Sequence, residues 1–163
     1  GNLSKIFGEL LMLIENDKRG EKMTLAYSRN SFSVPDNLYI IGMMNTADRS
    51  LSMIDYALRR RFSFYNVKPA FNNEKFIKYI NSLNSDYLNI TIENIKKLNE
   101  DIISDTSLGD GFQIGHSYFC NMKETDEIEI KSILNYEIMP MLEEYWFDST
   151  EKISEWKKVL LGE

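Results

Sequence analysis

The sequence predicts an α/β half followed by an all-helical half, and three observations carry that prediction. Before residue 68 the apolar residues alternate or run together in short segments, as they do in strands. Beyond Lys68-Pro69-Ala70 they recur every three to four residues, as they do in helices. The chain has 163 residues, 43% of them hydrophobic and 27% charged, which is an ordinary globular balance and about one domain's worth of chain. We therefore expect two parts, residues 1–68 and 69–163.

Two segments open the α/β half. Residues 4–16 should form an amphipathic helix capped by Asn2 or Ser4, because apolar residues recur there at helical spacing. Next come two apolar runs, residues 23–27 and 31–34, separated by three polar residues. This pattern predicts a β-hairpin.

Two further strands complete the prediction for this half. Residues 38–44 are apolar on both faces and rich in strand-forming residues, as a strand buried in a parallel sheet should be. A short helix is predicted over residues 51–60, and the alternation over residues 62–67 predicts another strand. Parallel strands need neighbours and crossover connections, and these segments supply too few of them. We therefore infer that residues 1–67 are the back half of a larger α/β domain.

The second half reads as helices interrupted by one loop. Residues 109–119 contain three glycines and break the helical period. The helices are predicted over residues 73–83, 88–104, 125–146 and 150–161.

Charge and cysteine content exclude several classes of protein. Lys and Arg total 19 against 25 Asp and Glu, so the formal net charge is −6. Such a chain is a poor candidate for gripping nucleic acid by itself, because phosphate neutralisation dominates that binding. The single cysteine, Cys120, permits no internal disulfide and favours a reducing, cytosolic compartment. No apolar run approaches the ~20 residues of a membrane span, and the first apolar stretch lacks the basic leader of a signal peptide.

The candidate chemistry lies at the end of the predicted buried strand. Asn45-Thr46-Ala47-Asp48-Arg49-Ser50 follows it directly, and ligands of open α/β sheets bind at the carboxyl ends of strands. An asparagine there can donate to a phosphate oxygen while accepting from a positioned water. The alternative is a polar turn in which Asp48 or Ser50 caps the next helix. The residues alone leave both open.

Three arginines, Arg59-Arg60-Arg61, begin eleven residues after Asp48. At the end of a helix they favour the helix dipole, and this alone could account for them. The alternative is that at least one projects into a neighbouring subunit and stabilises phosphoryl-transfer charge, a task that suits the permanently charged, bidentate guanidinium.

Five segments together carry a family resemblance: residues 2–11, 34–42, 44–50, 55–62 and 114–119. In these segments the sequence resembles the McrB family, the AAA+ motor subunits of methylation-dependent McrBC restriction systems. The likeness is dense over residues 2–67 and returns at 111–119. It implies a partial AAA+ α/β core, namely the second half of a P-loop NTPase sheet with a β-hairpin, followed by an all-helical lid domain.

The resemblance also implies roles at the strand end. Asn45 matches the sensor 1 asparagine, which positions the attacking water and reads the γ-phosphate. Thr46 and Asp48 complete the family signature beside the nucleotide. Arg49 is implied to belong to a network between subunits.

Three more residues match functional regions of the family. Arg60 and Arg61 match the region that supplies a trans-acting arginine finger, and the spacing does not decide which of them reaches the neighbour. His116 lies in the lid motif near the sensor 2 position, although the usual sensor 2 arginine is not evident there. A histidine that merely packs in the lid remains the alternative.

The phosphate-binding and acidic motifs of the family are not found in this sequence. It contains no Gly-x-x-x-x-Gly-Lys-[Ser/Thr], and in the family the Walker B strand directly precedes the segment that starts here at Gly1. The resemblance therefore implies a piece that starts just after Walker B. We expect GTP and Mg²⁺ as cofactors of the full-length protein, no metal ligands and no bound cofactor in this piece, and no hydrolysis by the piece alone.

Partners follow from the same resemblance. It implies a hexameric ring, a McrC-type endonuclease subunit, and restriction of DNA carrying 5-methylcytosine, with the DNA bound by a domain outside this chain; no membrane is expected. Two alternatives stay open: an ATP-using AAA+ protein of the remodelling-chaperone type, and a non-enzymatic module that binds through its lid and interface.

Overall fold

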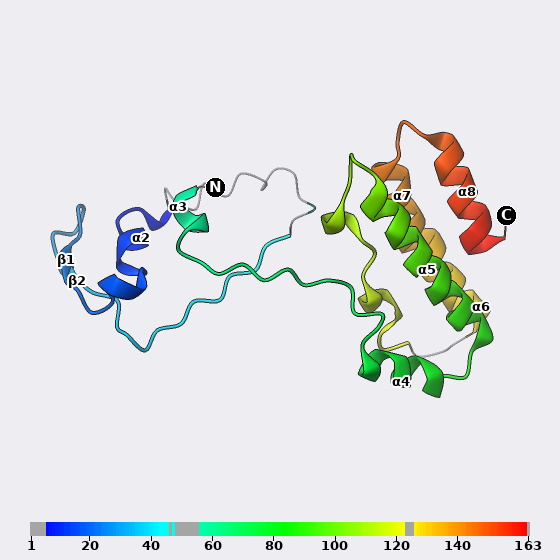
Figure 1. Cartoon of the computed structure of the whole chain (residues 1–163), viewed down its shortest axis with the longest axis horizontal. Coiled ribbons are helices and arrows are strands. Elements are labelled where there is room, and N and C mark those ends of the chain that lie inside the picture. The colour runs from blue at the N-terminus through cyan, green and yellow to red at the C-terminus, as the bar shows by residue number, and fades with distance from the viewer. Residues whose placement is uncertain (1–5, 46, 48–55, 123–125, 163) are drawn as a thin grey trace. The chain divides into compact units, whose positions relative to one another are not determined.

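The computed structural model describes residues 6–45, 47, 56–122 and 126–162. They belong to two compact units, residues 1–66 and 67–163 (Figure 1). Each unit is considered by itself below.

The second unit is all-helical, as predicted. Its helices begin and end within a few residues of the predicted bounds. They are α4 (Glu74–Ser82), α5 (Asp86–Ser104), α6 (Glu127–Ile133), the π-helical turn η5 (Leu134–Ile138), α7 (Met139–Tyr145) and α8 (Thr150–Leu161). Side chains cap three of them: Asn73, Ser85 and Asp126 accept hydrogen bonds from the backbone N–H groups of Lys75, Leu88 and Glu129.

Helix α5 forms the centre of this unit's core. Its buried apolar residues recur every three to four positions, so they share one face. Figure 1 shows the α6–α7 helix and α8 alongside α5, with α4 across one end. The fully buried residues along this face are Leu88, Ile95, Leu98 and Ile102.

A π-helical turn lies between α6 and α7, where proline interrupts the α-helical hydrogen bonds. Pro140 has no N–H to donate to the preceding turn, and the N–H of Met139 bonds instead to the carbonyl of Leu134, five residues back. The chain thereby stays helical across the proline. Ile130, Leu134, Ile138 and Leu142 all remain buried.

The glycine-dense loop is observed as predicted and contains two short 3₁₀ turns, η3 (Asp110–Phe112) and η4 (His116–Phe119). Gly109 precedes the first with φ of 87°, a left-handed conformation that favours glycine. Phe119 and Ile114 are buried in the core, so the loop packs against the helices.

The first unit departs from the prediction at its first helix. Gly8 adopts φ of 49°, which ends the helical conformation of Ile6 and Phe7. The helix resumes only as α2 (Leu10–Leu13), followed by a 3₁₀ turn, η1 (Asn16–Lys18). The prediction of one helix over residues 4–16 is therefore wrong in extent, and its predicted caps lie outside the described residues.

The predicted β-hairpin is confirmed, with shorter strands. β1 (Met23–Thr24) pairs antiparallel with β2 (Ser31–Phe32), and Met23 lies opposite Phe32. Both carboxylate oxygens of Glu9 accept from the N–H of Ala26, at 2.8 and 3.1 Å, which joins the hairpin to the turn before α2.

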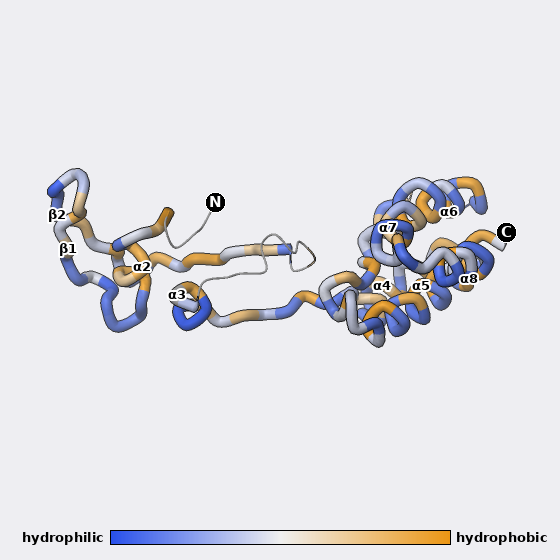
Figure 2. Tube along the Cα trace, turned by 90° about the horizontal axis from the view of Figure 1, so that it is seen from above, coloured by the Kyte–Doolittle hydropathy of each residue, from blue (hydrophilic) through white to orange (hydrophobic). Residues whose placement is uncertain are grey.

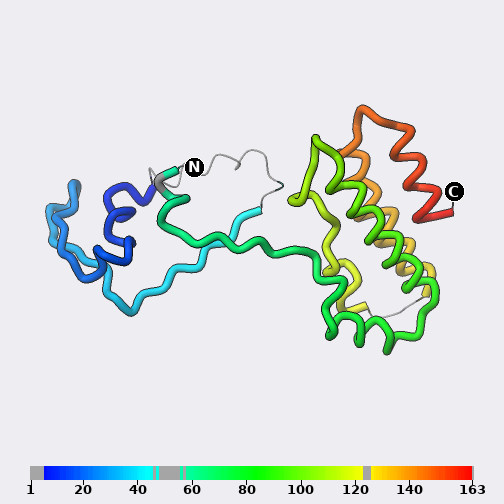
Figure 3. Tube along the Cα trace, viewed as in Figure 1, coloured from blue at the N-terminus to red at the C-terminus, as the bar shows by residue number. Residues whose placement is uncertain are grey.

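The two predicted sheet strands do not form in the described residues. Residues 38–44 and 62–67 are extended but belong to no sheet (Figure 3). In the first, Tyr39, Ile41 and Met43 are 87%, 92% and 98% exposed, and Figure 2 shows a largely hydrophobic stretch. A strand is stable only when its backbone groups pair with a neighbour. No described segment pairs with these two, so the prediction of a buried strand over 38–44 is wrong for this chain.

Candidate functional site

Asn45 is the one predicted residue of the strand-end signature that the structure describes. It is exposed, and its Oδ1 accepts a hydrogen bond from the N–H of Ala47 at 3.0 Å. This is the local turn that asparagine commonly forms with the backbone two residues on. Thr46, Asp48 and Arg49 lie outside the described residues. The side-chain amide NH₂ of Asn45 is still able to donate to a phosphate oxygen.

A small apolar cluster positions the arginines. Leu58 of α3 (Tyr56–Arg59) packs with Leu11 and Ile14 from around α2, and Ile40 and Phe62 pack against them. The cluster fixes the end of α3, from which the chain continues directly into Arg60 and Arg61.

The structure separates the two candidate finger residues. Nη2 of Arg61 lies 2.6 Å from Oε1 of Glu15, and the Arg61 side chain is only 9% exposed. Arg60 is exposed, and its side chain forms no hydrogen bond or ion pair with the part of the chain that the structure describes. Arg61 is therefore anchored within its own unit, whereas Arg60 is available to reach outward.

Both arginines line a hollow of about 400 Å³ together with Glu15, Asn16 and Asp17. Two of its five lining residues are acidic. Their carboxylates would repel a phosphate that entered this hollow.

His116 lies at the start of η4 in the helical unit. Its Nδ1 accepts a hydrogen bond from the N–H of Ala70 at 3.1 Å. The ring also packs edge-on against Phe71 and Phe76, with centroids 6.2 and 5.4 Å away. These three contacts fix the plane of the imidazole. These contacts agree with the lid-packing alternative, and within the described residues Nε2 of His116 has no hydrogen-bond partner.

Asn99 is a positioning residue that the sequence analysis missed. It is buried on α5, where its Nδ2 donates to the carbonyl of Ile114 at 2.9 Å and its Oδ1 accepts from the N–H of Ile114 at 2.6 Å. One side chain thereby satisfies both backbone groups of a buried loop residue. The segment that contains His116 is held to α5 by this pair. A polar residue on the apolar face of a predicted helix was the available signal.

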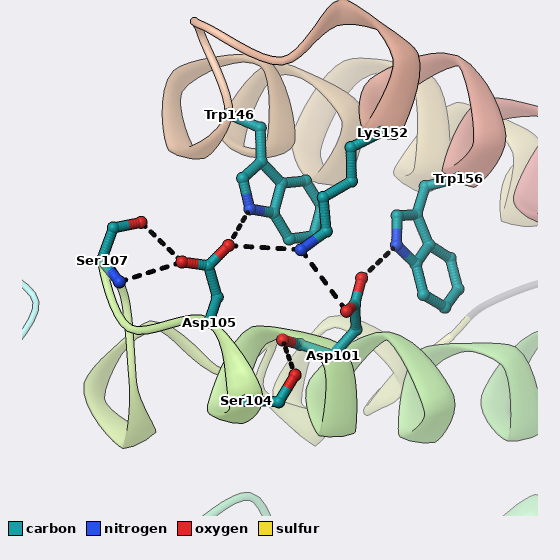
Figure 4. A network of polar contacts seen from close by, with 7 residues as sticks. All are labelled: Asp101, Ser104, Asp105, Ser107, Trp146, Lys152 and Trp156. Atoms are coloured by element: carbon teal, nitrogen blue, oxygen red, sulfur yellow. Dashed lines mark hydrogen bonds and ion pairs between the residues drawn. The ribbon is translucent and has the colours of Figure 1, made fainter.

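Figure 4 shows a second network, in which the carboxylates of Asp101 on α5 and of Asp105, the residue that caps the C-terminus of α5, bind residues of α8 and Trp146. Asp105 accepts from Nε1 of Trp146 at 2.8 Å and from Nζ of Lys152 at 3.2 Å. Asp101 accepts from Nε1 of Trp156 at 2.9 Å, and its Oδ1 lies 3.4 Å from the same lysine. Nζ of Lys152 also lies 4.3 Å from the centroid of the Trp146 ring.

The donors around Asp105 stabilise its charged form. The Ser107 hydroxyl and backbone N–H donate to its Oδ1 at 2.7 and 2.9 Å, and Trp146 and Lys152 donate to its Oδ2. These hydrogen bonds, the Ser107 hydroxyl foremost, hold the pKa of Asp105 well below its ordinary value of 3.8. The network links α5 to α8, so its role is to hold these two helices together rather than to form a catalytic site.

No group of three or more His, Cys, Asp or Glu side chains among the described residues could hold a metal ion. Nor do the described helices include one with the length and hydrophobicity to cross a bilayer.

Comparisons with known proteins agree with this arrangement. The family model of the AAA domain, dynein-related subfamily, matches residues 2–62, and the model of the McrB alpha-helical lid domain matches residues 91–154. An Escherichia coli K12 protein described as the type IV methyl-directed restriction enzyme EcoKMcrB subunit is 45% identical over an alignment 174 residues long. The alignment covers 99% of this chain and 38% of that relative, so the chain spans little more than a third of the relative's length. With an AAA segment, an McrB lid and this identity along almost its whole length, the chain belongs to the McrB family.

Proposed function

We propose that this chain is the second half of the motor domain, with its lid, of a GTP-hydrolysing McrB-type AAA+ subunit. The observation that carries the proposal is the 45% identity to the E. coli restriction subunit over 99% of the chain. The parent protein would drive DNA translocation and cleavage of DNA carrying 5-methylcytosine, in the cytoplasm. The order of the two matched segments, AAA followed by lid, supports the same assignment.

The proposed domain division is 1–68 for the partial α/β core and 69–163 for the lid. The core would contribute Asn45 as the sensor that positions the attacking water at the γ-phosphate. Thr46, Asp48 and Arg49 would complete the site and its contact with the next subunit. His116 would approach the nucleotide from the lid.

We assign the trans-acting finger to Arg60 and a positioning role to Arg61. Arg60 is exposed and unpaired within the described part of its own chain. Arg61 is held by Glu15 at 2.6 Å, so it fixes the end of α3 from which Arg60 projects. A guanidinium that reaches a neighbour's phosphates stabilises the charge of the transition state, and its removal costs roughly 10³–10⁵ in rate in comparable nucleotidases.

Partners and cofactors belong to the parent protein. We propose a hexameric ring, because a trans-acting arginine requires a neighbouring subunit, and a McrC-type nuclease as the second component. The net charge of −6 supports DNA binding by a domain outside this chain. Mg²⁺ would be a cofactor of the full-length protein together with GTP, and this chain alone should be inactive.

The decisive experiment measures GTP and ATP turnover by the full-length protein with its McrC-type partner. Arg60→Ala should abolish GTP hydrolysis, whereas Arg61→Ala should reduce it less and lower the melting temperature. Arg60→Lys is the matched control for charge without the bidentate fork. Equal loss in Arg60→Ala and Arg61→Ala, with unchanged melting temperatures, would contradict the division of roles.

Mixing two inactive proteins tests the trans arrangement directly. Under this proposal one subunit supplies Asn45, and its neighbour supplies Arg60, to the same nucleotide site. A ring mixed from Asn45→Ala and Arg60→Ala subunits therefore contains some sites in which both residues are intact, and it should regain part of the activity. Failure of any mixture to exceed its components would argue for action within one subunit. Absence of hydrolysis of either nucleotide by the wild-type complex would remove the motor assignment itself.

A further inference from the structure

His116 lines a pocket of the helical unit. The volume of this pocket is about 410 Å³, within the range of small-molecule sites. Phe76 and Cys120 supply apolar lining, and Lys75, Tyr79 and His116 supply polar groups. All of these residues belong to one compact unit, so the pocket is complete within it.

The hydrogen bond from Ala70 determines where the imidazole carries its proton. A ring nitrogen that accepts an N–H must be unprotonated, and Nδ1 accepts from Ala70 at 3.1 Å. The neutral ring therefore carries its proton on Nε2. No acceptor for Nε2 lies among the residues that the structure describes, and Phe71 and Phe76 hold the ring in place. His116 thus offers one fixed hydrogen-bond donor.

The neighbouring polar groups of the pocket also offer donors. Oδ1 of Asn73 accepts from the N–H of Lys75 at 2.9 Å, which leaves its NH₂ group to donate. The hydroxyl of Tyr79 accepts from the N–H of Met122 at 3.0 Å, which leaves its O–H to donate. The Lys75 ammonium makes no ion pair within the described ranges. Among the lining residues, only the Asn121 side chain can present an acceptor as readily as a donor, and none is acidic.

A pocket of donors over an apolar wall selects a flat ligand whose edge carries acceptors. Guanine presents the adjacent acceptors O6 and N7 along one edge, whereas adenine presents an NH₂ donor in place of O6. An adenine amino group facing the N–H of His116 would leave two donors opposed. The preference for guanine over adenine would therefore follow from the fixed position of the proton on Nε2 of His116.

We propose that His116 determines base specificity by donating from Nε2 to O6 of guanine. This inference rests on the proposed function, because it names the base of the nucleotide that the motor would hydrolyse. It gives His116 two separate tasks: Nδ1 holds the loop to Ala70, and Nε2 reads the base.

The test uses the full-length protein with its partner and compares two substitutions that divide these tasks. In His116→Asn the side-chain oxygen can still accept from the N–H of Ala70, but the side chain is too short to reach the position of Nε2. In His116→Gln the longer side chain can place an NH₂ donor at that position. His116→Asn should lower the ratio of kcat/KM for GTP over ATP about tenfold, the usual effect of one lost hydrogen bond, and His116→Gln should stay within about threefold of wild type.

A nucleotide analogue tests the same contact without any substitution. 2-Aminopurine riboside triphosphate lacks O6, so the wild-type protein should use it about tenfold less efficiently than GTP, and His116→Asn should use the two almost equally. Lys152→Ala, which perturbs the lid at the distant α5–α8 contact, serves as the control and should leave both ratios unchanged.

The outcomes separate the two proposals. Wild-type preference for GTP that His116→Asn leaves intact, with only a lower melting temperature, would make His116 a packing residue and overturn the inference while the motor stands. Preference for ATP, or equal use of GTP and the analogue by the wild-type protein, would also overturn it. Hydrolysis of no nucleotide by the wild-type complex would overturn the proposed function and the inference with it.

Discussion

The two units of this chain differ in how far their apolar residues are buried. In the helical unit the face of α5 is closed, and Leu88, Ile95 and Leu98 are fully buried. In the first unit the most apolar segment is open, and Ile41 and Met43 are almost fully exposed. Both segments contain apolar side chains that could be buried, so the presence of apolar residues does not explain the difference.

The difference lies in where each element finds its hydrogen-bond partners. A helix satisfies its backbone groups within one segment, and its apolar stripe needs only other helices nearby in the chain. A strand of a parallel sheet depends on neighbours that lie far away in sequence. The helical unit contains all the partners that its elements need, whereas residues 38–44 and 62–67 meet none among the described residues.

Expressing the two units separately should show the greatest difference between them, and the measured quantity is the cooperativity of unfolding. Residues 67–163 expressed alone should show one cooperative thermal transition by circular dichroism, because their core is complete. Residues 1–66 alone should show none, because their buried clusters are small. A cooperative transition in the shorter piece, or its loss in the longer one, would contradict the account.

Two matched side-chain truncations, one in each unit, test the same difference in burial at single residues. Leu98→Ala removes a fully buried side chain from α5 and should lower the free energy of unfolding by about 2–5 kcal/mol. Ile41→Ala removes a side chain that is 92% exposed and should change it by less than about 0.5 kcal/mol. Urea unfolding of the whole chain measures both, and similar values for the two would refute the contrast.

Asn99→Ala tests how the loop of the helical unit is held. It leaves the buried N–H and carbonyl of Ile114 without their partner, which should lower the free energy of unfolding by about 1–3 kcal/mol. Limited proteolysis should cut the 105–122 segment faster in this variant. Asn94→Ala is a control on the same helix, since Asn94 makes a single exposed hydrogen bond to the carbonyl of Val159. Unchanged proteolysis in Asn99→Ala would show that core packing alone holds the loop.

The smallest expected effect is a pH dependence confined to the helical unit. The pKa of Asp105 is lowered in the folded state, so its charged form contributes stability at pH values above its ordinary pKa of 3.8, and this contribution is lost as pH falls below it. Asp105→Asn should therefore be less stable than wild type at pH 7, and the gap should narrow toward pH 3. Thermal melts of residues 67–163 between these pH values measure the gap, and a constant gap would contradict the linkage.

Sequence reasoning succeeded where local signals were sufficient. The spacing of Leu88, Ile95 and Ile102 was enough to predict α5 from residue 88 onward, whereas its cap, Ser85, was not predicted. It was wrong at Gly8, because an isolated glycine can either continue a helix or end it, and its positive φ here is set by the surrounding structure. The strand predictions over residues 38–44 and 62–67 were wrong because an apolar pattern shows only a tendency to form a strand, and a stable strand needs a second segment with which to pair.

The candidate site was predicted only as separate residues. The sequence could indicate Asn45, Arg60 and His116, but not the contacts that distinguish them. The ion pair of Arg61 with Glu15 forms only because two segments far apart in the sequence lie together in the fold. The position of the proton on His116 depends on a hydrogen bond from the N–H of Ala70, forty-six residues earlier. Asn99 left a trace in the sequence, a polar residue on an apolar helical face, whose importance becomes clear only from the loop packed against it.

The two indole contacts with α5 give this chain a built-in optical reporter. Trp146 and Trp156 are the only tryptophans in the sequence, and each donates its Nε1–H to a carboxylate at the α5–α8 contact. Intrinsic tryptophan fluorescence therefore comes entirely from the helical unit. A shift in its emission when nucleotide or a partner is added would record a change in the packing of α8 on α5, without any label and without interference from residues 1–66.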